Sequence, residues 1–373
     1  MRREVPLLPD PLKALDGRII RTRESWETHR RPEILSLFRE HVYGYGYGPE
    51  FDSASLTFRC TEKRLMAGDS TRIKPVEIQF EGAYGQGMMH LVLYLPRSAV
   101  TRLPLVLVIS TNLPSSWNLA DELHAPVSDM LARGYGVGVY FVEELDPDVD
   151  DGFHNGVHGL FDPKSRPRSP NAWGTIAAWA WGASRVMDYL QTDEDIDCTR
   201  VVLVGHSRLG KTALWAAAND SRFAMVASNQ SGCTGAAVSR TKTGETVRDI
   251  NQRFPHWFCQ NYKQFNDRED SLPVDQHLLL SLIAPRLIYV TSASEDVWAD
   301  PEAEFLSVTV QEPVYALYRL RGLGTSTPPY PNIPLVGERI GYHMRTGAHD
   351  FTVFDWRGIL SFADTHLNAP IVP

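Results

Sequence analysis

The sequence predicts an α/β protein with a mostly parallel central sheet and an antiparallel hairpin at its N-terminal side. Two nearly continuous apolar runs, residues 104–110 and 135–142, are typical of parallel strands that are buried on both faces. Helical patterns alternate with such runs along the chain, which indicates right-handed crossovers within a three-layer αβα sandwich. Residues 76–80 alternate between apolar and polar, and a second run at 90–95 follows a Gly-rich turn. That pattern predicts the hairpin.

The remaining elements follow from the spacing of apolar residues. A helix is expected over residues 26–42, where Ile34, Leu35, Phe38 and Val42 recur at helical spacing. Further patterns predict helices at 128–133, 173–190 and 356–366, and strands at 201–204, 224–229, 286–292 and 340–345. No linker or internal repeat interrupts the chain. We therefore expect an N-terminal arm and helix, residues 1–50, packed on a single α/β domain, residues 51–373.

Composition excludes several classes of function. The chain has 373 residues, 43% of them hydrophobic and 22% charged, which is enough for a large core in a soluble protein. A formal net charge of -8 and the absence of a Lys/Arg run argue against a nucleic-acid partner. No apolar window is long enough to cross a bilayer, so we expect no membrane partner. The N-terminal residues MRREVPLLPDPL lack the apolar core of a signal peptide.

The sequence predicts neither a metal site nor a cofactor. Its four cysteines are Cys60, Cys198, Cys233 and Cys259. None stand in a CxxC pair, so we expect buried free thiols rather than a zinc or redox site. His154 and His158 are four residues apart, but they lie in a polar loop at 146–170 without a helical pattern. The loop YGYGYGP lacks the Lys-Ser/Thr pair of a phosphate-binding loop.

Residues 201–218, VVLVGHSRLGKTALWAAA, carry the main functional signal. A strand, a sharp turn with a serine and a helix form the layout of a nucleophile elbow, in which Ser207 would be the nucleophile. The second glycine, Gly210, comes one residue later than in G-x-S-x-G, and an ordinary βα turn capped by serine is the alternative. The backbone N–H of Arg208 is an expected oxyanion donor. Its guanidinium either adds charge there or pairs with a surface carboxylate.

A serine nucleophile needs a base and an acid to orient that base. In α/β-hydrolases both follow the serine in the chain, the acid first, on loops after strands. His349 fits the base because it follows the last strand and precedes the final helix. For the acid we prefer Asp296, with Glu295 as the alternative, and either could instead cap the next helix. His206 is expected to point elsewhere on the turn.

The other histidines fit the role of base less well. His256 and His277 are expected in helical segments, and His343 lies inside a predicted strand. Lys211, one helical turn beyond Ser207, could receive a carboxylate or sugar hydroxyls.

Several motifs resemble those of one enzyme family, the glucuronoyl esterases of carbohydrate esterase family 15, in their bacterial form. GHSRLGK at 205–211 is similar to the family's GxSRxGK motif. The likeness extends over most of the chain, through WETHRRPEILSLFREHVYG, WGTIAAWAWGASRVMDYL, RFPHWF, LPVDQHLLLSLIAPR, SEDVWADP and YHMRTGAHDFTVFDW. The resemblance implies an α/β-hydrolase fold, with Ser207 as nucleophile, His349 as base and Arg208 as oxyanion stabiliser.

The resemblance also implies a sugar site. Lys211, Glu245 and Trp298 would bind the glucuronate ring, with the indole as an apolar wall, although Trp298 could equally be a core residue. Many members carry the triad glutamate where this chain has Gln230, and other bacterial members place the acid where Asp296 stands. Fungal members have a cysteine before the serine, in a disulfide near the histidine. This chain has His206 and Asp350 instead.

Together these observations predict a serine carboxylesterase that hydrolyses esters of (4-O-methyl-)glucuronic acid, as in lignin–glucuronoxylan cross-links, through an acyl-enzyme. The alternatives are an esterase for other plant cell-wall esters, acetyl-xylan or feruloyl, and a catalytically weak carbohydrate-binding homologue. We expect a carbohydrate substrate as the partner and a monomer. The resemblance implies a secreted or periplasmic protein.

Overall fold

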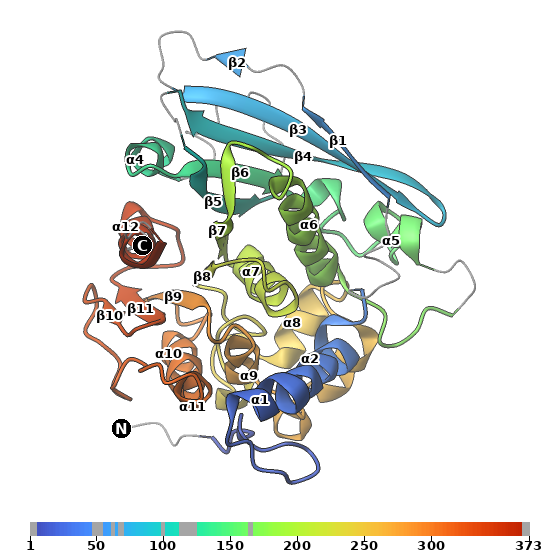
Figure 1. The fold of residues 1–373 in the computed structure, drawn as a ribbon. Helices are drawn as coiled ribbons and strands as arrows, with labels where there is room; N and C mark the ends of the chain where they lie inside the picture. The colour runs from blue at the N-terminus through green and yellow to red at the C-terminus, as the bar shows by residue number, and fades with distance from the viewer. Residues whose placement is uncertain are drawn as a thin grey trace.

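The computed structural model describes residues 6–46, 55–60, 64–65, 71–97, 101–111, 125–162 and 167–367. Across these residues one mixed sheet of eleven strands runs through the molecule (Figure 1). The strand order is β1-β3-β4-β6-β5-β7-β8-β9-β11-β10, with β2 paired to β3. The strands are β1 (Ser55–Cys60), β2 (Arg64–Leu65), β3 (Thr71–Gly82), β4 (Gly85–Pro96), β5 (Leu103–Ser110), β6 (Gly136–Phe141), β7 (Ile196–His206), β8 (Met225–Asn229), β9 (Leu287–Ala293), β10 (Leu335–Val336) and β11 (Ile340–Arg345).

The centre of the sheet is parallel and its edges are antiparallel. β6, β5, β7, β8, β9 and β11 pair in parallel in that order. β3 and β4 form the predicted hairpin, which pairs with β1 on one side and with β6 on the other, antiparallel in both cases. The predicted α/β fold class is therefore confirmed.

Helices cover both faces of the sheet (Figure 1). α4 (Val127–Ala132) and α12 (Val353–Leu367) lie on one face, and α6 (Thr175–Leu190) and α7 (Arg208–Asn219) lie on the other. Two apolar clusters fill the space between these layers. Along β5, Leu105 and Leu107 join one cluster, whereas Val106 and Val108 join the other. Successive residues of a strand point to opposite faces, so a strand buried on both faces reads as a continuous apolar run.

The remaining described helices complete the layers. They are α1 (Arg23–Ser25), η1 (Trp26–Arg30), α2 (Arg31–Phe38), η2 (Arg39–Tyr43), η3 (Val142–Glu144), α5 (Gly156–Phe161), η4 (Ser239–Thr241), α8 (Val247–Arg253), η5 (Gln260–Phe265), η6 (Glu269–Ser271), α9 (Gln276–Ser281), α10 (Pro301–Val310) and α11 (Glu312–Ala316). None of the helices in the described ranges is long and apolar enough to cross a membrane.

The N-terminal helix packs on the helix that follows the elbow. The predicted helix at 26–42 is present as three consecutive segments, a π-helical turn, α2 and a second π-helical turn. Phe38 is fully buried, and the ring of Tyr43 stacks on that of Trp215 in α7 with 4.2 Å between centroids. The N-terminal region therefore shares the main apolar core of the protein.

Some local predictions were wrong. The segment at 146–170, predicted as a loop, contains the short helix α5. His154 is exposed and His158 is buried, so the two side chains do not point to the same place. Within the described ranges, no group of three or more metal-binding side chains lies close enough together to hold an ion. All four cysteines are free as predicted, but Cys60 is exposed and Cys198 is half-buried, so only two of the thiols are fully buried.

Candidate active site

The strand-to-helix turn after β7 has the strained geometry of a nucleophile elbow. Ser207 has φ 57° and ψ -123°, a region that costs a non-glycine residue about 1–3 kcal/mol. A Cβ at Gly205 would collide with the carbonyl of Leu209. A Cβ at Gly210 would lie 2.9 Å from Cβ of Ser231. The turn therefore needs both glycines, and at the late Gly210 helix α7 passes close to Ser231 in the chain after β8.

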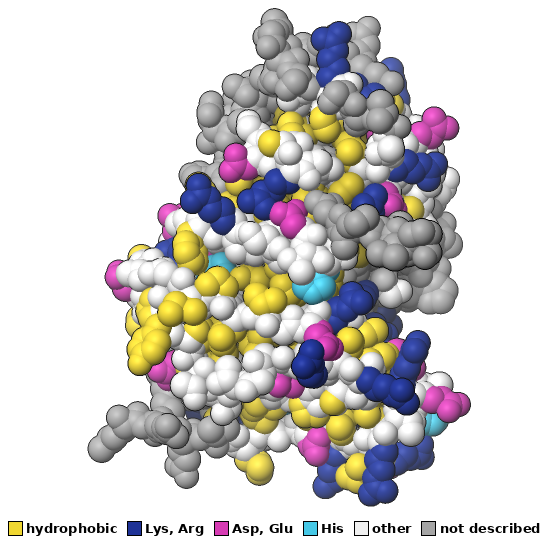
Figure 2. Space-filling model, turned by 60° about the vertical axis from the view of Figure 1, so that its left-hand side comes forward, with side chains coloured by type: hydrophobic (Ala, Val, Ile, Leu, Met, Phe, Trp, Pro, Cys, Tyr) yellow, Lys and Arg dark blue, Asp and Glu magenta, His cyan; other side chains and the backbone are white. Residues whose placement is uncertain are grey.

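Ser207 and His349 line one cleft of about 580 Å³ at the carboxyl ends of the parallel strands. Its other walls come from β5, the segment after β6 and the elbow, and include Ser110, Glu143 and Phe351. Figure 2 shows one face of the molecule, on which histidine side chains lie beside a broad run of hydrophobic ones. A ligand pocket of this size at the carboxyl edge of a parallel sheet is the usual position for an active site.

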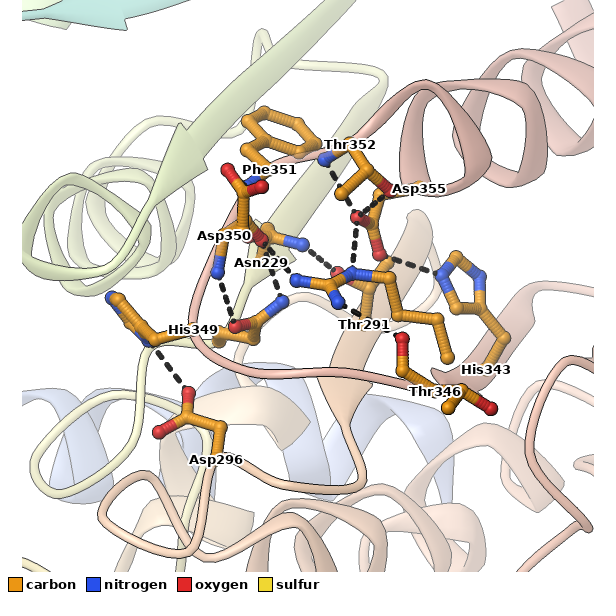
Figure 3. Close-up of polar contacts among 12 residues, drawn as sticks. Asn229, Thr291, Asp296, His343, Thr346, His349, Asp350, Phe351, Thr352 and Asp355 are labelled. Atoms are coloured by element: carbon orange, nitrogen blue, oxygen red, sulfur yellow. Dashed lines mark hydrogen bonds and ion pairs between the residues drawn. The ribbon is translucent and has the colours of Figure 1, made fainter.

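His349 is hydrogen-bonded to Asp296 (Figure 3). The two atoms, Nδ1 of the imidazole and Oδ2 of the carboxylate, are 2.6 Å apart. The loops that carry them follow β9 and β11, which pair in parallel, with Ala293 opposite Arg345. Asp296 is buried, whereas Glu295 is exposed. Of the two candidate carboxylates, the structure brings Asp296 to the histidine.

His206 does not point away from the site, contrary to the prediction. Its ring lies 4.7 Å from that of His349 and also faces Phe351. Its Nδ1 donates to the side-chain oxygen of Asn229. Burial, and then the adjacent His349, lower the pKa of His206 to about 4, so its ring is neutral at physiological pH. His206 is the last residue of β7, and the alternation along the strand puts its side chain on the same face as Val204, toward the histidine loop.

Asp148 forms an ion pair with the Arg208 guanidinium at the edge of the cleft, and sequence reasoning did not identify this partner. Asp148 also accepts hydrogen bonds from His256 Nε2 at 2.9 Å and Trp257 Nε1 at 2.7 Å. Burial acts to raise the pKa of Asp148, but these two donors and Arg208 outweigh it and hold the pKa below its usual value. Asp148 follows β6 at the carboxyl edge of the sheet, and that position was the one available signal.

The indole of Trp257 also lies beneath the guanidinium. The centre of the Arg208 guanidinium is 5.0 Å from the Trp257 ring and 5.4 Å from that of Phe254. Both contacts are of cation–π type. His256 is in a turn after α8 rather than in a helix, whereas His277 is in α9 and His343 in β11, as predicted.

The structure brings together the three residues predicted for a sugar site. Lys211 Nζ lies 3.8 Å from the Glu245 carboxylate, and the backbone N–H of Glu245 donates to the carbonyl of Trp298 at 2.9 Å. Trp298 is 46% exposed and so is not a core residue. Lys211 is only 4% exposed, and its ammonium also donates to the carbonyls of Ser231, at 2.6 Å, and Cys233. Two of its three donors are therefore used within the protein.

Comparisons with known proteins agree on one family. The family model for fungal glucuronyl esterase matches residues 168–318. A carbohydrate esterase, MZ0003, from an unknown prokaryotic organism is 41% identical over 96% of this chain and 89% of its own length. The solved structure of a glucuronoyl esterase from Solibacter usitatus is 38% identical with a TM-score of 0.88, covering 97% of this chain and 98% of that one. A promiscuous CE15 esterase from a marine bacterial metagenome is 39% identical with a TM-score of 0.87, covering 98% of each chain. This chain therefore belongs to carbohydrate esterase family 15, the glucuronoyl esterases, which are carboxylic ester hydrolases with the α/β-hydrolase fold.

Proposed function

We propose that this protein is a serine esterase that cleaves esters of 4-O-methyl-glucuronic or glucuronic acid, such as those that join lignin alcohols to glucuronoxylan. The observation that carries the proposal is a strained Ser207 in one cleft with His349, whose Nδ1 is bonded to the buried Asp296. The membership in the glucuronoyl esterases supports the class of ester.

In the proposed mechanism, His349 Nε2 takes the proton of the Ser207 hydroxyl as its oxygen attacks the ester carbonyl. An ionised Asp296 can only accept a hydrogen bond, so it fixes Nδ1 as the protonated nitrogen and leaves Nε2 free as the base. The tetrahedral intermediate collapses when His349 returns the proton to the departing alcohol. Water, activated by the same histidine, then hydrolyses the acyl-enzyme and regenerates Ser207. These steps need no metal or cofactor.

The oxyanion would form beside the N-terminus of α7. The backbone N–H of Arg208 is the first of that helix, where the helix dipole favours negative charge. The Arg208 guanidinium, held in place by Asp148, adds a full positive charge at the edge of the same cleft. Asp148 would therefore set where that charge stands during the reaction.

Lys211, Glu245 and Trp298 would form the subsite for the uronate ring. The exposed indole offers an apolar face for a pyranose, and the Glu245 carboxylate accepts from ring hydroxyls. The third N–H of the Lys211 ammonium is not used by the Ser231 and Cys233 carbonyls, so it is left for the Glu245 carboxylate or a hydroxyl of the uronate ring. In this arrangement the sugar binds on the β8–β9 side of Ser207.

The experiment that tests the proposed function is the hydrolysis of benzyl glucuronate by the wild-type protein and by Ser207→Ala. We expect activity that the substitution abolishes, together with slower turnover of acetyl-xylan and feruloyl esters. Hydrolysis that survives in Ser207→Ala would contradict the nucleophile assignment. A wild-type protein that cleaves only acetyl or feruloyl esters would contradict the substrate class.

A fluorophosphonate probe separates the proposed esterase from a catalytically weak carbohydrate-binding homologue. The homologue is suggested by the missing carboxylate at Gln230, but Asp296 supplies a carboxylate to His349 from another loop. We expect the probe to label Ser207. We further propose a monomeric, single-domain protein that is secreted or periplasmic, since its polymeric substrate lies outside the cell.

A further inference from the structure

We propose that Gln230 is a positioning residue for the catalytic histidine: its side-chain amide holds the loop that carries His349 in place against the Ser207 turn. The inference rests on the proposed function, because it takes Ser207 and His349 as nucleophile and base. It gives a role to an amide that stands where many members of the family carry the triad glutamate.

The amide of Gln230 clamps the residue that follows the histidine. The backbone N–H of Asp350 donates to Gln230 Oε1 at 3.0 Å, and Gln230 Nε2 donates to the carbonyl of Asp350 at 2.7 Å. This pair of bonds needs a donor and an acceptor side by side on one side chain. A glutamine provides both, whereas an ionised glutamate provides two acceptors. Since Asp350 is bonded directly to His349 in the chain, the clamp sets where the histidine backbone lies.

The same stretch of chain also holds the nucleophile. The backbone N–H of Ser207 donates to the carbonyl of Asn229 at 2.8 Å. Asn229 immediately precedes Gln230 at the end of β8, so two consecutive residues hold the nucleophile and the base. The side-chain amide of Asn229 accepts from His206 through its oxygen and donates to the hydroxyl of Thr291 in β9 through its nitrogen. The Ser207–His349 separation is therefore set through Asn229 and Gln230.

The backbone of Gln230 is fixed in an unusual conformation. The residue is 1% exposed and has φ 47°, a left-handed region that is unfavourable for glutamine. Its N–H donates to the carbonyl of Thr291 at 2.8 Å. A strained backbone of this kind persists where the surroundings fix it firmly, and such residues concentrate at functional sites. In this case the conformation aims the side chain at Asp350.

The side chain of Arg345 also hydrogen-bonds to the loop that carries His349. Arg345 Nη2 donates to the carbonyls of Ala348, at 2.7 Å, and Asp350, at 2.9 Å. The guanidinium is itself fixed by Asp355, whose carboxylate accepts from Arg345 Nε at 2.9 Å (Figure 3 shows Asp355 beside Thr352 and His343). The carbonyl of Asp350 thus receives one neutral and one charged donor, and Gln230 supplies the neutral one.

Replacing the amide by a carboxyl, in Gln230→Glu, makes the clamp depend on pH. The protonated carboxyl could donate to the Asp350 carbonyl, but the ionised carboxylate would place a second acceptor against it. Several elements bring charged or titratable groups to this position. Arg345 belongs to β11 and Asp355 to α12, and the loop between them carries His349 and Asp350. The other groups are Asp296 in the loop after β9, His206 in β7, and Glu304 in α10, whose carboxylate accepts from the N–H of Gly232. The cations Arg345 and Lys211 lie near this position. The donors of Arg345 are already used by Asp355 and by loop carbonyls, and the ammonium of Lys211 in α7 donates to the carbonyls of Ser231 and Cys233.

The test compares Gln230→Met, which keeps the length without the hydrogen bonds, and Gln230→Glu with the wild-type protein. Two rates are measured from pH 5 to 9: kcat on benzyl glucuronate, and labelling of Ser207 by a fluorophosphonate. We expect Gln230→Met to lower both about 10- to 100-fold at every pH, with KM little changed, because a displaced base slows the chemical step. For Gln230→Glu we compare each rate with the wild-type rate at the same pH. We expect this variant-to-wild-type ratio to fall as pH rises; if the new carboxyl is already ionised at pH 5, the ratio is low over the whole range.

Thermal unfolding and soluble yield serve as the folding controls for both variants. The inference is overturned if Gln230→Met keeps the wild-type kcat and labelling rate, or if Gln230→Glu matches the wild type at every pH. Its failure is distinguishable from that of the proposed function. If the wild-type protein labels at Ser207 without cleaving benzyl glucuronate, the substrate proposal fails, and the labelling rates still test Gln230. If the wild-type protein does not label, the nucleophile assignment itself fails, and this inference falls with it.

Discussion

Asp296 and Glu295 are neighbours in the chain but have different surroundings, which makes them a matched pair for testing the triad acid. Asp296→Asn keeps the size of the side chain but presents an amide to His349, which favours the wrong imidazole tautomer. We expect kcat on benzyl glucuronate to fall about 10³- to 10⁴-fold, with a KM close to that of the wild type. Glu295→Gln, at the exposed position, is expected to keep the wild-type kcat. The opposite result would identify Glu295 as the acid.

Single residues were predictable where the signal is local in the sequence. Ser207 lies in a contiguous strand–turn–helix motif, and His349 and Asp296 follow strands whose carboxyl ends meet at one edge of the sheet. Asp148 could not be assigned to Arg208 in this way, because the contact depends on the path of an irregular segment after β6. The neighbour of His206 was missed because β7 extends to His206, so that its side chain follows the alternation of Val202 and Val204, whereas the sequence was read as a turn from Gly205 onward.

Among the helices and strands, the apolar runs predicted the parallel strands well, because burial on both faces leaves no room for polar residues. Short elements that depend on tertiary contacts were harder. α5 has only the six residues Gly156–Phe161, and its stability comes from packing rather than from its own sequence. α6 was predicted with one apolar face, but nearly all of its side chains are buried because it packs on the sheet beside α7 and is also covered by the segments that carry Phe161 and Trp257.

In the described chain between β6 and α6, residues 142–162 and 167–174, a buried histidine contacts two carboxylates. His158 is at the centre of α5. Its Nε2 lies 3.4 Å from the Asp146 carboxylate, and its Nδ1 lies 3.7 Å from that of Asp162. Near the start of α6, the Thr175 hydroxyl donates to Asp146 and the Trp173 indole N–H donates to Asp162. The cluster therefore fastens the segment that carries Asp148 to the body of the protein.

We expect this cluster to stabilise the protein at acid pH. Burial acts to lower the pKa of His158, but Asp146 and Asp162 outweigh it and raise the pKa above its usual value. A raised pKa in the folded state adds stability that is fully present below about pH 6.5 and is lost as pH rises through the folded pKa. The difference in melting temperature between the wild type and His158→Gln should therefore be largest at pH 5–6 and shrink at pH 8–9.

His154→Gln is the matched control for that experiment, since His154 is exposed on the same segment. It should leave the melting temperature unchanged across the range. A difference between the wild type and His158→Gln that is constant with pH would mean that His158 acts through packing rather than charge.

For the molecule as a whole, the packing of the N-terminal helix on α7 predicts one cooperative unit. Phe38 is fully buried and contacts the ring of Trp215 at a centroid distance of 6.3 Å. Phe38→Ala removes this contact from the shared core and should destabilise the protein by about 3–5 kcal/mol. By calorimetry we expect a single transition at lower temperature, whereas the exposed Ser36→Ala should change little. A separate early transition in Phe38→Ala would show that residues 1–50 form an independent unit.

The position of Asp296 links the residues that follow two neighbouring strands. β8 and β9 are adjacent parallel strands, so the loops after both end near the histidine, and the fold offers two places from which a carboxylate can arrive. The loop after β9 brings Asp296 to His349 Nδ1, and the residue after β8, Gln230, hydrogen-bonds to the next residue of the histidine loop. A carboxylate in place of Gln230 would meet a histidine whose Nδ1 already has a partner, and its ionised form would lose the donor to the Asp350 carbonyl. The two positions are therefore coupled: a single Gln230→Glu substitution removes one contact without supplying a new partner for Nδ1.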